Sequence, residues 1–316
     1  MTDASTAAVA APNFANIDPL KLLGQVLALA VRHKASDIHL RARNHPIFRV
    51  DGDLRAIKEV PPLPPDFMER LARTIMTARL LAQFEKNHQV ELSIGFKDIG
   101  RVRANVFYQR GTIGLVLRVI NTVVPSPEEL NLPSMVRDFL TLERGLILIT
   151  GATGSGKSTT LAAMINHVNE TKHDHILTIE DPIEFVHTSK NCLINQREVH
   201  RDTLGFDKAL RSALREDPDV ILVGEMRDLE TIRLALSAAE TGHLVFGTLH
   251  TSSAAKTIDR IVDVFPAAEK EMVRAMLSES LRAVISQTLL KKIGGGRVAA
   301  HEIMIDTPAI RNLIRE

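Results

Sequence analysis

The residues best suited to chemistry form a glycine-rich segment near the middle of the chain. It reads Gly151-Ala152-Thr153-Gly154-Ser155-Gly156-Lys157-Ser158 and continues with Thr159. Two glycines separated by four residues and followed by Lys and Ser are the pattern of a phosphate-binding loop. Such glycines let backbone N–H groups converge on phosphate oxygens, and a helix starting there adds its positive end. The segment therefore predicts a nucleotide site, with Lys157 on the β- and γ-phosphates and the Ser158 hydroxyl on Mg²⁺.

Two acidic residues follow apolar runs further along the chain. Glu180 comes directly after Ile176–Ile179, and Glu225 follows Val220–Val223 with one glycine between. A single acid in this position commonly caps the next helix. Two acids that end strands beside a phosphate loop are instead suited to hold Mg²⁺ through water or to polarise an attacking water. We expect both to be catalytic, and the residues alone leave open which one is the base.

Two histidines flank a further apolar run, Leu244–Phe246. His243 precedes this run, and His250 follows it within Gly247-Thr248-Leu249-His250-Thr251. A histidine in an apolar strand is usually a hydrogen-bonded core residue. At a strand end beside a phosphate loop, His250 is instead suited to sense the γ-phosphate, whereas spacing leaves the two interpretations of His243 equally supported.

These residues need a sheet to position them. Short apolar runs alternate with helical segments such as Thr159–Asn169, and the runs are Leu146–Ile149, Ile176–Ile179, Val220–Val223 and Leu244–Phe246. Strands that are apolar throughout are buried on both faces, as in a parallel α/β sheet. Ligands bind such sheets at the carboxyl ends of the strands. We therefore expect an α/β fold with the site at that edge.

The first part of the chain follows a different pattern and predicts a mixed α+β unit. One strand alternates Val102, Ala104 and Val106 with Arg101, Arg103 and Asn105, so its arginines share a face. The other expected elements are a helix at Leu20–Lys34, strands from Ser36 to Leu40 and at Ile47–Val50, a turn at Asp51-Gly52-Asp53, an irregular segment at Pro61–Pro65, helical spacing at Phe67–Phe84, a turn at Gln109-Arg110-Gly111-Thr112 and a strand at Ile113–Ile120.

Three prolines and the lack of a period between Asn121 and Pro133 indicate a linker. The predicted domains are a disordered tail at 1–18, a smaller N-terminal α+β domain at 19–120, a linker at 121–133 and a phosphate-loop domain at 134–316.

Composition excludes several classes of protein. The chain has 316 residues, of which 45% are hydrophobic and 24% charged, as in a soluble globular protein. No apolar run approaches the roughly 18 residues of a membrane-spanning helix, and the first residues lack the basic start of an export signal. A single cysteine, Cys192, rules out an internal disulfide and a multi-cysteine zinc site. We expect a cytosolic protein without a transmembrane segment.

The net charge of +1 is the sum of unlike parts. Residues 1–120 hold 17 Lys+Arg, 12 of them Arg, against 11 Asp+Glu, whereas residues 121–316 hold 22 against 27. An excess of this size is not the footprint of a nucleic-acid binder. With no Trp and one Tyr, stacking platforms for single strands are also scarce. We therefore expect no direct nucleic-acid partner.

Together these segments resemble the secretion ATPase superfamily that drives type II secretion and type IV pili, from about Leu20 to the last residue. The segment Ile176 to Phe185 looks like its Asp box, Asp217 to Asp228 its Walker B segment, and Thr241 to Thr251 its His box. Ser36-Asp37-Ile38-His39 and Arg49-Val50-Asp51-Gly52 are similar to the start of its N-terminal domain.

Two further segments are similar to the pilus-retraction branch of this superfamily. They are Asn105 to Gly111 and the ending Ala309-Ile310-Arg311-Asn312-Leu313-Ile314-Arg315-Glu316. The ending predicts an amphipathic helix, with Thr307 as the cap, Pro308 in the first turn, and Ile310, Leu313 and Ile314 on one face. The tail before Leu20 is longer than the branch predicts, and the chain stops where retraction motors normally continue, so a truncated chain and a retraction-like paralogue stay open.

The resemblance implies a homohexameric ATPase with a RecA-like domain, a PAS-like N-terminal domain, and ATP and Mg²⁺ as cofactors. It implies that Glu180 activates the attacking water and that Glu225 positions Mg²⁺ and water. Arg101, Arg103, Arg110 and Arg118 would supply cations to the γ-phosphoryl group, with Arg101 and Arg103 favoured by their shared face. The implied partner is the pilus platform protein, at the cytoplasmic face of the inner membrane.

Other functions stay open at this stage. One is a nucleotide-gated subunit that barely hydrolyses ATP, against which the intact Lys157, Glu180 and Glu225 argue. Another is a nucleic-acid translocase, against which the charge and the scarce aromatics argue. Extension motors and conjugative ATPases of the same superfamily are disfavoured by the absent cysteines and by the last eight residues.

Overall fold

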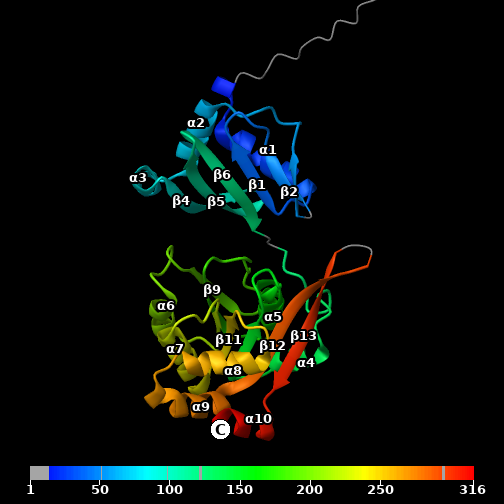
Figure 1. Ribbon diagram of the computed structural model, residues 1–316, viewed down its shortest axis with the longest axis vertical. Coiled ribbons are helices and arrows are strands. Elements are labelled where there is room, and N and C mark those ends of the chain that lie inside the picture. Colours follow the sequence, from blue (N-terminus) through cyan, green and yellow to red (C-terminus); the bar gives the residue numbers. More distant parts are fainter. Residues whose placement is uncertain (1–13, 51, 98, 121–122, 294–295) are drawn as a thin grey trace, which may run out of the picture. The chain divides into compact units, whose positions relative to one another are not determined.

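The computed structural model describes residues 14–50, 52–97, 99–120, 123–293 and 296–316. The chain divides into two compact units, residues 1–122 and 123–316, and each is built around its own sheet (Figure 1). Most of the predicted tail, Asp51 of the predicted turn and the first two linker residues lie outside the described residues. From 123 to 133 the backbone forms no helix or strand. The predicted domain boundaries stay a prediction.

The first unit is a six-stranded antiparallel sheet covered by helices. Its strand order is β3-β2-β1-β6-β5-β4. The strands are β1 Asp37–Arg41, β2 Ile47–Val50, β3 Asp53–Ala56, β4 Gln89–Phe96, β5 Gly100–Gln109 and β6 Thr112–Ile120, and the helices are the 3₁₀ turn Phe14–Asn16, α1 Pro19–Arg32, α2 Pro65–Ile75 and α3 Ala78–Asn87.

One face of this sheet packs on the helices, and the other carries polar side chains. Val102, Ala104 and Val106 of β5 are buried in one core with Leu27 of α1 and Met68 of α2. The alternate residues of β5 point to the opposite face, as the period of two requires. The mixed α+β unit and its arginine face therefore follow the sequence pattern.

The structure differs from the expected elements of this unit in three places. The helical spacing from Phe67 to Phe84 is two helices, because the backbone is extended at Met76 and Thr77, and Thr77 caps α3. Strands β3 and β4 were not expected, and β3 is exposed along its whole length. Phe14, expected in the disordered tail, is buried against Phe67 with ring centroids 5.3 Å apart.

The second unit is a seven-stranded sheet of order β13-β12-β7-β11-β10-β8-β9, parallel except for β13. The strands are β7 Gly145–Thr150, β8 His175–Glu180, β9 Leu193–Glu198, β10 Val220–Val223, β11 Leu244–Leu249, β12 Leu281–Lys291 and β13 Arg297–Ile305. The helices are α4 Ser134–Leu140, α5 Lys157–Thr171, α6 Phe206–Ala213, α7 Leu229–Glu240, α8 Ala254–Asp263, the 3₁₀ turn Ala267–Glu269, α9 Lys270–Ser280 and α10 Pro308–Arg315.

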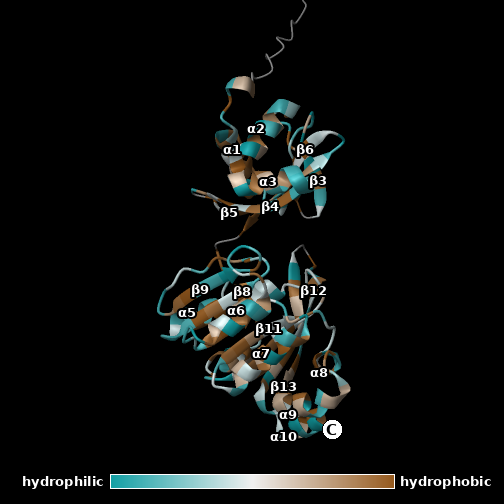
Figure 2. Ribbon diagram, turned by 90° about the vertical axis from the view of Figure 1, so that its left-hand side faces the viewer, coloured by the Kyte–Doolittle hydropathy of each residue, from teal (hydrophilic) through white to brown (hydrophobic). Residues whose placement is uncertain are grey.

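Both faces of this sheet are buried, as the continuous apolar runs predict. Helices α4 and α5 pack on one face through residues such as Phe139 and Ile165. Helices α6 to α9 pack on the other face through residues such as Leu236 and Leu277. Apolar residues predominate in the central strands of this unit, and polar residues occur along the helices that cover them (Figure 2). The predicted α/β class, with all four apolar runs as parallel strands, is confirmed.

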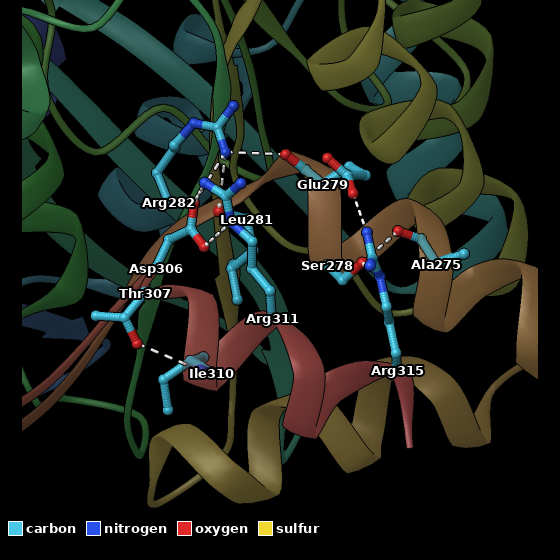
Figure 3. Close-up of polar contacts among 10 residues, drawn as sticks. All are labelled: Ala275, Ser278, Glu279, Leu281, Arg282, Asp306, Thr307, Ile310, Arg311 and Arg315. Atoms are coloured by element: carbon cyan, nitrogen blue, oxygen red, sulfur yellow. Dashed lines mark hydrogen bonds and ion pairs between the residues drawn. The ribbon is translucent and has the colours of Figure 1, made fainter.

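The C-terminal segment forms the predicted helix, but its predicted apolar face is wrong in part. Thr307 Oγ1 accepts from the Ile310 N–H, so the cap is as expected. Ile314 is buried and Ile310 packs beside it, whereas Leu313 is 66% exposed. Arg311 donates to Asp306 at 2.6 Å and Arg315 donates to Ser278 at 2.9 Å (Figure 3). These polar contacts fix the rotation of the helix and leave Leu313 outward.

No helix within the described part of the chain has the length and apolarity to cross a membrane.

Candidate active site

The glycine-rich loop joins β7 to α5 at the carboxyl edge of the second sheet. Residues 151–156 form the turn, and Lys157, Ser158 and Thr159 make up the first turn of α5. Gly156 precedes the helix with φ +90°, and a Cβ there would lie 2.8 Å from Gln287 Nε2. The backbone conformation therefore favours glycine, and a side chain here would displace the Gln287 carboxamide. The N-terminus of α5 begins at the end of the loop, which is the arrangement of an anion site.

Lys157 is buried and bonded to the loop itself. Its Nζ donates to the carbonyl of Gly151 at 2.8 Å and to that of Ala152 at 3.1 Å. Burial lowers the pKa of Lys157, and the charges of Glu225 and Glu184 oppose that shift. Ser155 Oγ is also buried and lacks a hydrogen-bond partner within the described structure. A cation and an unpaired hydroxyl inside one turn fit a phosphate group.

Gln287 of β12 fastens the loop from the neighbouring strand. Its Nε2 donates to the Ser155 carbonyl at 2.7 Å, and its Oε1 accepts from Thr160 Oγ1 at 2.8 Å. One residue earlier, Ser286 shares a 2.6 Å hydrogen bond with Thr150. Sequence reasoning missed Gln287, since it lies 127 residues beyond Thr160 and belongs to no local motif.

Glu225 lies within a chain of polar groups after β10. Its carboxylate pairs with Arg227, and His250 Nε2 lies 3.1 Å from Glu225 Oε1. His250 Nδ1 lies 3.4 Å from Lys157 Nζ. The structure thus brings together three residues predicted from separate strand ends, Lys157, Glu225 and His250. His250 links the phosphate-loop lysine to the acid, which suits a sensor of phosphate charge.

Glu180, the last residue of β8, has a different environment. Its Oε1 accepts from Thr178 Oγ1 at 2.7 Å and from Gln196 Nε2 at 3.2 Å. Gly224 passes so close that a Cβ on it would lie 3.1 Å from the Glu180 Cα. Sequence reasoning missed both partners, and only the position of Thr178 on the same face of β8, two residues earlier, could have suggested one.

The two carboxyl groups have pKa shifts of opposite direction. Burial is the largest effect on Glu180 and raises its pKa, despite the hydrogen bonds from Thr178 and Gln196. Burial also acts on Glu225, but the hydrogen bond and charge of Arg227, together with His250, outweigh it and lower the pKa. Paired acids whose environments separate their pKa values in this way are suited to different roles.

His243 lies at the amino end of β11, whereas the site is at the carboxyl end. Its Nδ1 lies 2.9 Å from the Ala238 carbonyl, in the turn that ends α7. The structure therefore favours a structural role for this histidine.

The predicted arginines belong to the first unit. Arg101 and Arg103 share the polar face of β5, where Arg101 donates to Ser93 Oγ at 2.6 Å and Arg103 pairs with Glu91. Arg118 of β6 lies opposite Arg103 in the register and donates to Asp37 Oδ1 at 2.6 Å. The structure thus brings these three arginines into one patch.

Arg110 does not join that patch. It lies in the exposed turn between β5 and β6, with φ +47°. Seven residues of extended chain separate it from Arg103, a distance of about 23 Å.

The oxygen donors near the loop fit Mg²⁺. Mg²⁺ prefers hard oxygen ligands and at nucleotide sites uses one or two protein oxygens together with phosphates. The Ser158 hydroxyl and the Glu225 carboxylate are donors of that kind. The described residues hold no group of three or more His, Cys, Asp or Glu side chains arranged for a metal ion.

A model of the type II/IV secretion system protein family matches residues 15–296. The chain belongs to this family. It is 63% identical over 292 residues to the type IV pilus retraction ATPase PilT of Pseudomonas aeruginosa, covering 92% of this chain and 85% of the relative. It is 60% identical to the twitching motility protein of Neisseria gonorrhoeae, covering 86% and 72%.

The fold is similar to that of solved members of this family. A crystal structure of the pilus retraction motor PilT with bound ADP matches with a TM-score of 0.89 and 53% identity, covering 93% of this chain and 85% of that one. The family resemblance predicted from the motifs is therefore confirmed, as is the fold class of a RecA-like phosphate-loop unit with a smaller α+β unit.

Proposed function

We propose that this chain is the ATPase motor of type IV pilus retraction, and that Lys157, Glu180, Glu225 and His250 carry its chemistry. The single observation that supports this most strongly is the chain of contacts from the phosphate-loop Lys157 through His250 to Glu225 at the carboxyl edge of a parallel sheet. The 63% identity to a pilus retraction ATPase supports the biological process.

Glu180 is the base in this proposal. Burial raises its pKa, and a carboxylate with a raised pKa accepts a proton more readily from an attacking water. The oxygen that accepts from Thr178 and Gln196 is Oε1, so those contacts orient the carboxylate at the strand tip. A proton taken from water at Glu180 would leave the hydroxide to attack the γ-phosphorus, with ADP as the leaving group.

In this proposal the negative charge of the nucleotide phosphates is balanced by Mg²⁺, held by Glu225 and Ser158, and by Lys157. The lowered pKa of Glu225 keeps it ionised, as a metal ligand must be, and with Ser158 it would hold Mg²⁺. Bound there, Mg²⁺ would neutralise charge on the β- and γ-phosphates. Lys157 would exchange its loop carbonyls for phosphate oxygens, and His250 would follow that exchange through its contacts with Lys157 and Glu225.

The remaining assignments extend this proposal. Arg101, Arg103, Arg118 and Arg110 are candidates to stabilise charge on the transferred phosphoryl group, with the first three supported by their common patch. The working form would be a homohexamer at the cytoplasmic face of the inner membrane, acting on the pilus platform protein and without a direct nucleic-acid partner.

The test combines turnover with motility. The purified 316-residue chain and its Glu180→Gln variant are assayed for steady-state ATP hydrolysis, and both are expressed in a retraction-deficient strain scored for twitching. We expect the wild type alone to hydrolyse ATP and to restore twitching. Absence of ATP hydrolysis by the wild type would overturn the proposal. Hydrolysis without rescue would point to another secretion or assembly ATPase of the family.

A further inference from the structure

Gln196 contacts Glu180 and the chain that follows it at three points. It lies on β9, beside Thr178 of β8 in the parallel register. Its Nε2 donates to Glu180 Oε1 at 3.2 Å and to the Phe185 carbonyl at 2.9 Å, while its Oε1 accepts from the His187 N–H at 2.8 Å. One carboxamide therefore joins the strand tip to the segment after it.

That segment depends on side chains for its position. Residues 181–192 form no helix or strand, so sheet or helix hydrogen bonds do not fix their backbone. Near its end, Asn169 of α5 donates to the Thr188 carbonyl and accepts from the Lys190 N–H. Near its start, Gln196 makes the corresponding pair of backbone contacts at Phe185 and His187. The start of the segment is thus tied to the same side chain that holds Glu180.

We propose that Gln196 is a positioning residue for ATP hydrolysis, which orients the Glu180 carboxylate and keeps residues 181–187 in register with it. This inference rests on the proposed role of Glu180 as the base. A carboxamide suits the task because its N–H donates to a carboxylate while its oxygen accepts from the backbone, and neither group titrates.

The same contact sets the electrostatics of the base. Burial raises the pKa of Glu180, and the Glu184 charge adds to that effect, whereas the hydrogen bonds from Thr178, Gln196 and the Glu184 backbone lower it. Removing the Gln196 donor withdraws one of these opposing contacts, so the pKa of Glu180 rises further. A variant without the donor should therefore need a higher pH for full activity.

The test compares Gln196→Ala with Asn195→Ala in the 316-residue chain. Asn195 carries the same functional group one residue earlier but is exposed on the other face of β9, with Nδ2 2.9 Å from His175 Nε2. We measure kcat and KM for ATP across pH, and the affinity for a fluorescent ADP analogue. Gln196→Ala should lower kcat by about 10- to 100-fold, the size of loss seen when a group that orients a metal ligand is removed. The ADP affinity should be unchanged, and the acidic side of the kcat–pH profile should move to higher pH.

Gln196→Glu sharpens the result. It keeps an acceptor for the His187 N–H but replaces the donor to Glu180 with a second carboxylate. The acidic side of its kcat–pH profile should therefore move to higher pH than that of Gln196→Ala. Asn195→Ala should keep the wild-type kcat and pH profile.

Three outcomes would overturn the inference. The first is a wild-type kcat and pH profile in Gln196→Ala. The second is a loss of kcat and ADP affinity together with an unmoved acidic side of the kcat–pH profile, which would show a structural role only. The third is full turnover in Glu180→Gln, which would remove the base and, with it, the inference. If Glu180→Gln is inactive and Gln196→Ala is normal, the positioning role fails and the base assignment stands.

Discussion

The tips of β8 and β10 are neighbours at one edge of the same parallel sheet, yet their carboxyl groups are in opposite environments. Glu180, at the tip of β8, is largely withdrawn from solvent and accepts from the uncharged donors Thr178 and Gln196. Glu225, after β10, is paired with Arg227 and contacts His250. Position on the sheet is shared, so the difference comes from the residues that surround each tip.

This difference teaches how one sheet edge can supply two chemistries. Desolvation makes a carboxylate a stronger base, because its charged form loses water and gains no counter-charge. A guanidinium keeps a carboxylate ionised and suited to bind a cation. If this interpretation is right, changes at the β8 tip should act on proton transfer, and changes at the β10 tip should act on Mg²⁺ dependence.

The largest expected effect is that of Glu180→Gln. The variant keeps the size of the side chain but cannot accept a proton, and general-base groups contribute about 10²- to 10⁴-fold in rate. We expect kcat to fall by that amount with ADP affinity unchanged, measured by steady-state ATP hydrolysis and by binding of a fluorescent ADP analogue. A loss of less than tenfold would make the two tips equivalent.

The second effect concerns His187, in the segment that follows the β8 tip. Burial lowers the pKa of His187 to about 4 from its ordinary 6.5, so the unfolded chain binds a proton more readily between those values. Stability is thus full above pH 6.5 and falls as the pH decreases toward 4, by about 3 kcal/mol for this residue.

Urea unfolding at pH 7 and pH 4.5 measures this effect. In His187→Gln, the fall in unfolding free energy between the two pH values should be smaller than in the wild type. His173→Gln, which changes an exposed histidine before β8, is the matched control and should behave as the wild type does. Equal falls in wild type and His187→Gln would mean that the segment after Glu180 is open to water.

A third, smaller effect is expected from Glu225→Gln at the β10 tip. The loss of a charged oxygen donor should lower kcat by about 10- to 100-fold and raise the Mg²⁺ concentration for half-maximal turnover. Mg²⁺ titrations of ATP hydrolysis measure both, and Glu230→Gln, which alters an acid at the exposed start of α7, serves as the control. If the Mg²⁺ requirement is unchanged, the charge pairing at this tip has another purpose.

The smallest effect is that of Arg227→Ala. Removal of the guanidinium takes away the main opposition to burial, so the pKa of Glu225 rises. Activity should be nearly normal at pH 8 and should fall below wild type as the pH decreases. A pH profile of kcat/KM that overlays the wild type would contradict the electrostatic comparison of the two tips.

The parts of the fold that could be predicted are those with a local pattern. The phosphate loop is contiguous, and the four parallel strands are apolar throughout, so both follow from short stretches of sequence. Strands β3 and β9 could not be found in this way, because β3 is exposed and β9 is at the sheet edge with polar residues. The break between α2 and α3 could not be found either, because the helical period of the sequence continues across the two extended residues that separate the helices.

The residues of the candidate site also divide into those with a local sequence pattern and those without one. Lys157, Glu225 and His250 each lie beyond the end of a parallel strand, so strand ends alone could predict that they come together, and Glu180 ends the strand beside β10. Gln196 and Gln287 reach the site from β9 and β12 through contacts that depend on the strand order, which no local pattern encodes. The outward position of Leu313 depends likewise on the polar contacts of Arg311 and Arg315, which lie around it on α10.

Strand β12 has a mechanical consequence. Near its start, Arg282 donates to Asp306 at 3.1 Å, and Asp306 in turn holds Arg311 of α10. Five residues later, Gln287 holds the phosphate loop. After an irregularity at Arg282, residues 283–286 pair on both sides, with β7 and with β13, and an extended backbone spans about 16 Å over five residues. An extended, paired strand stretches little under load. A force applied to α10 would therefore be transmitted along β12 to the phosphate loop.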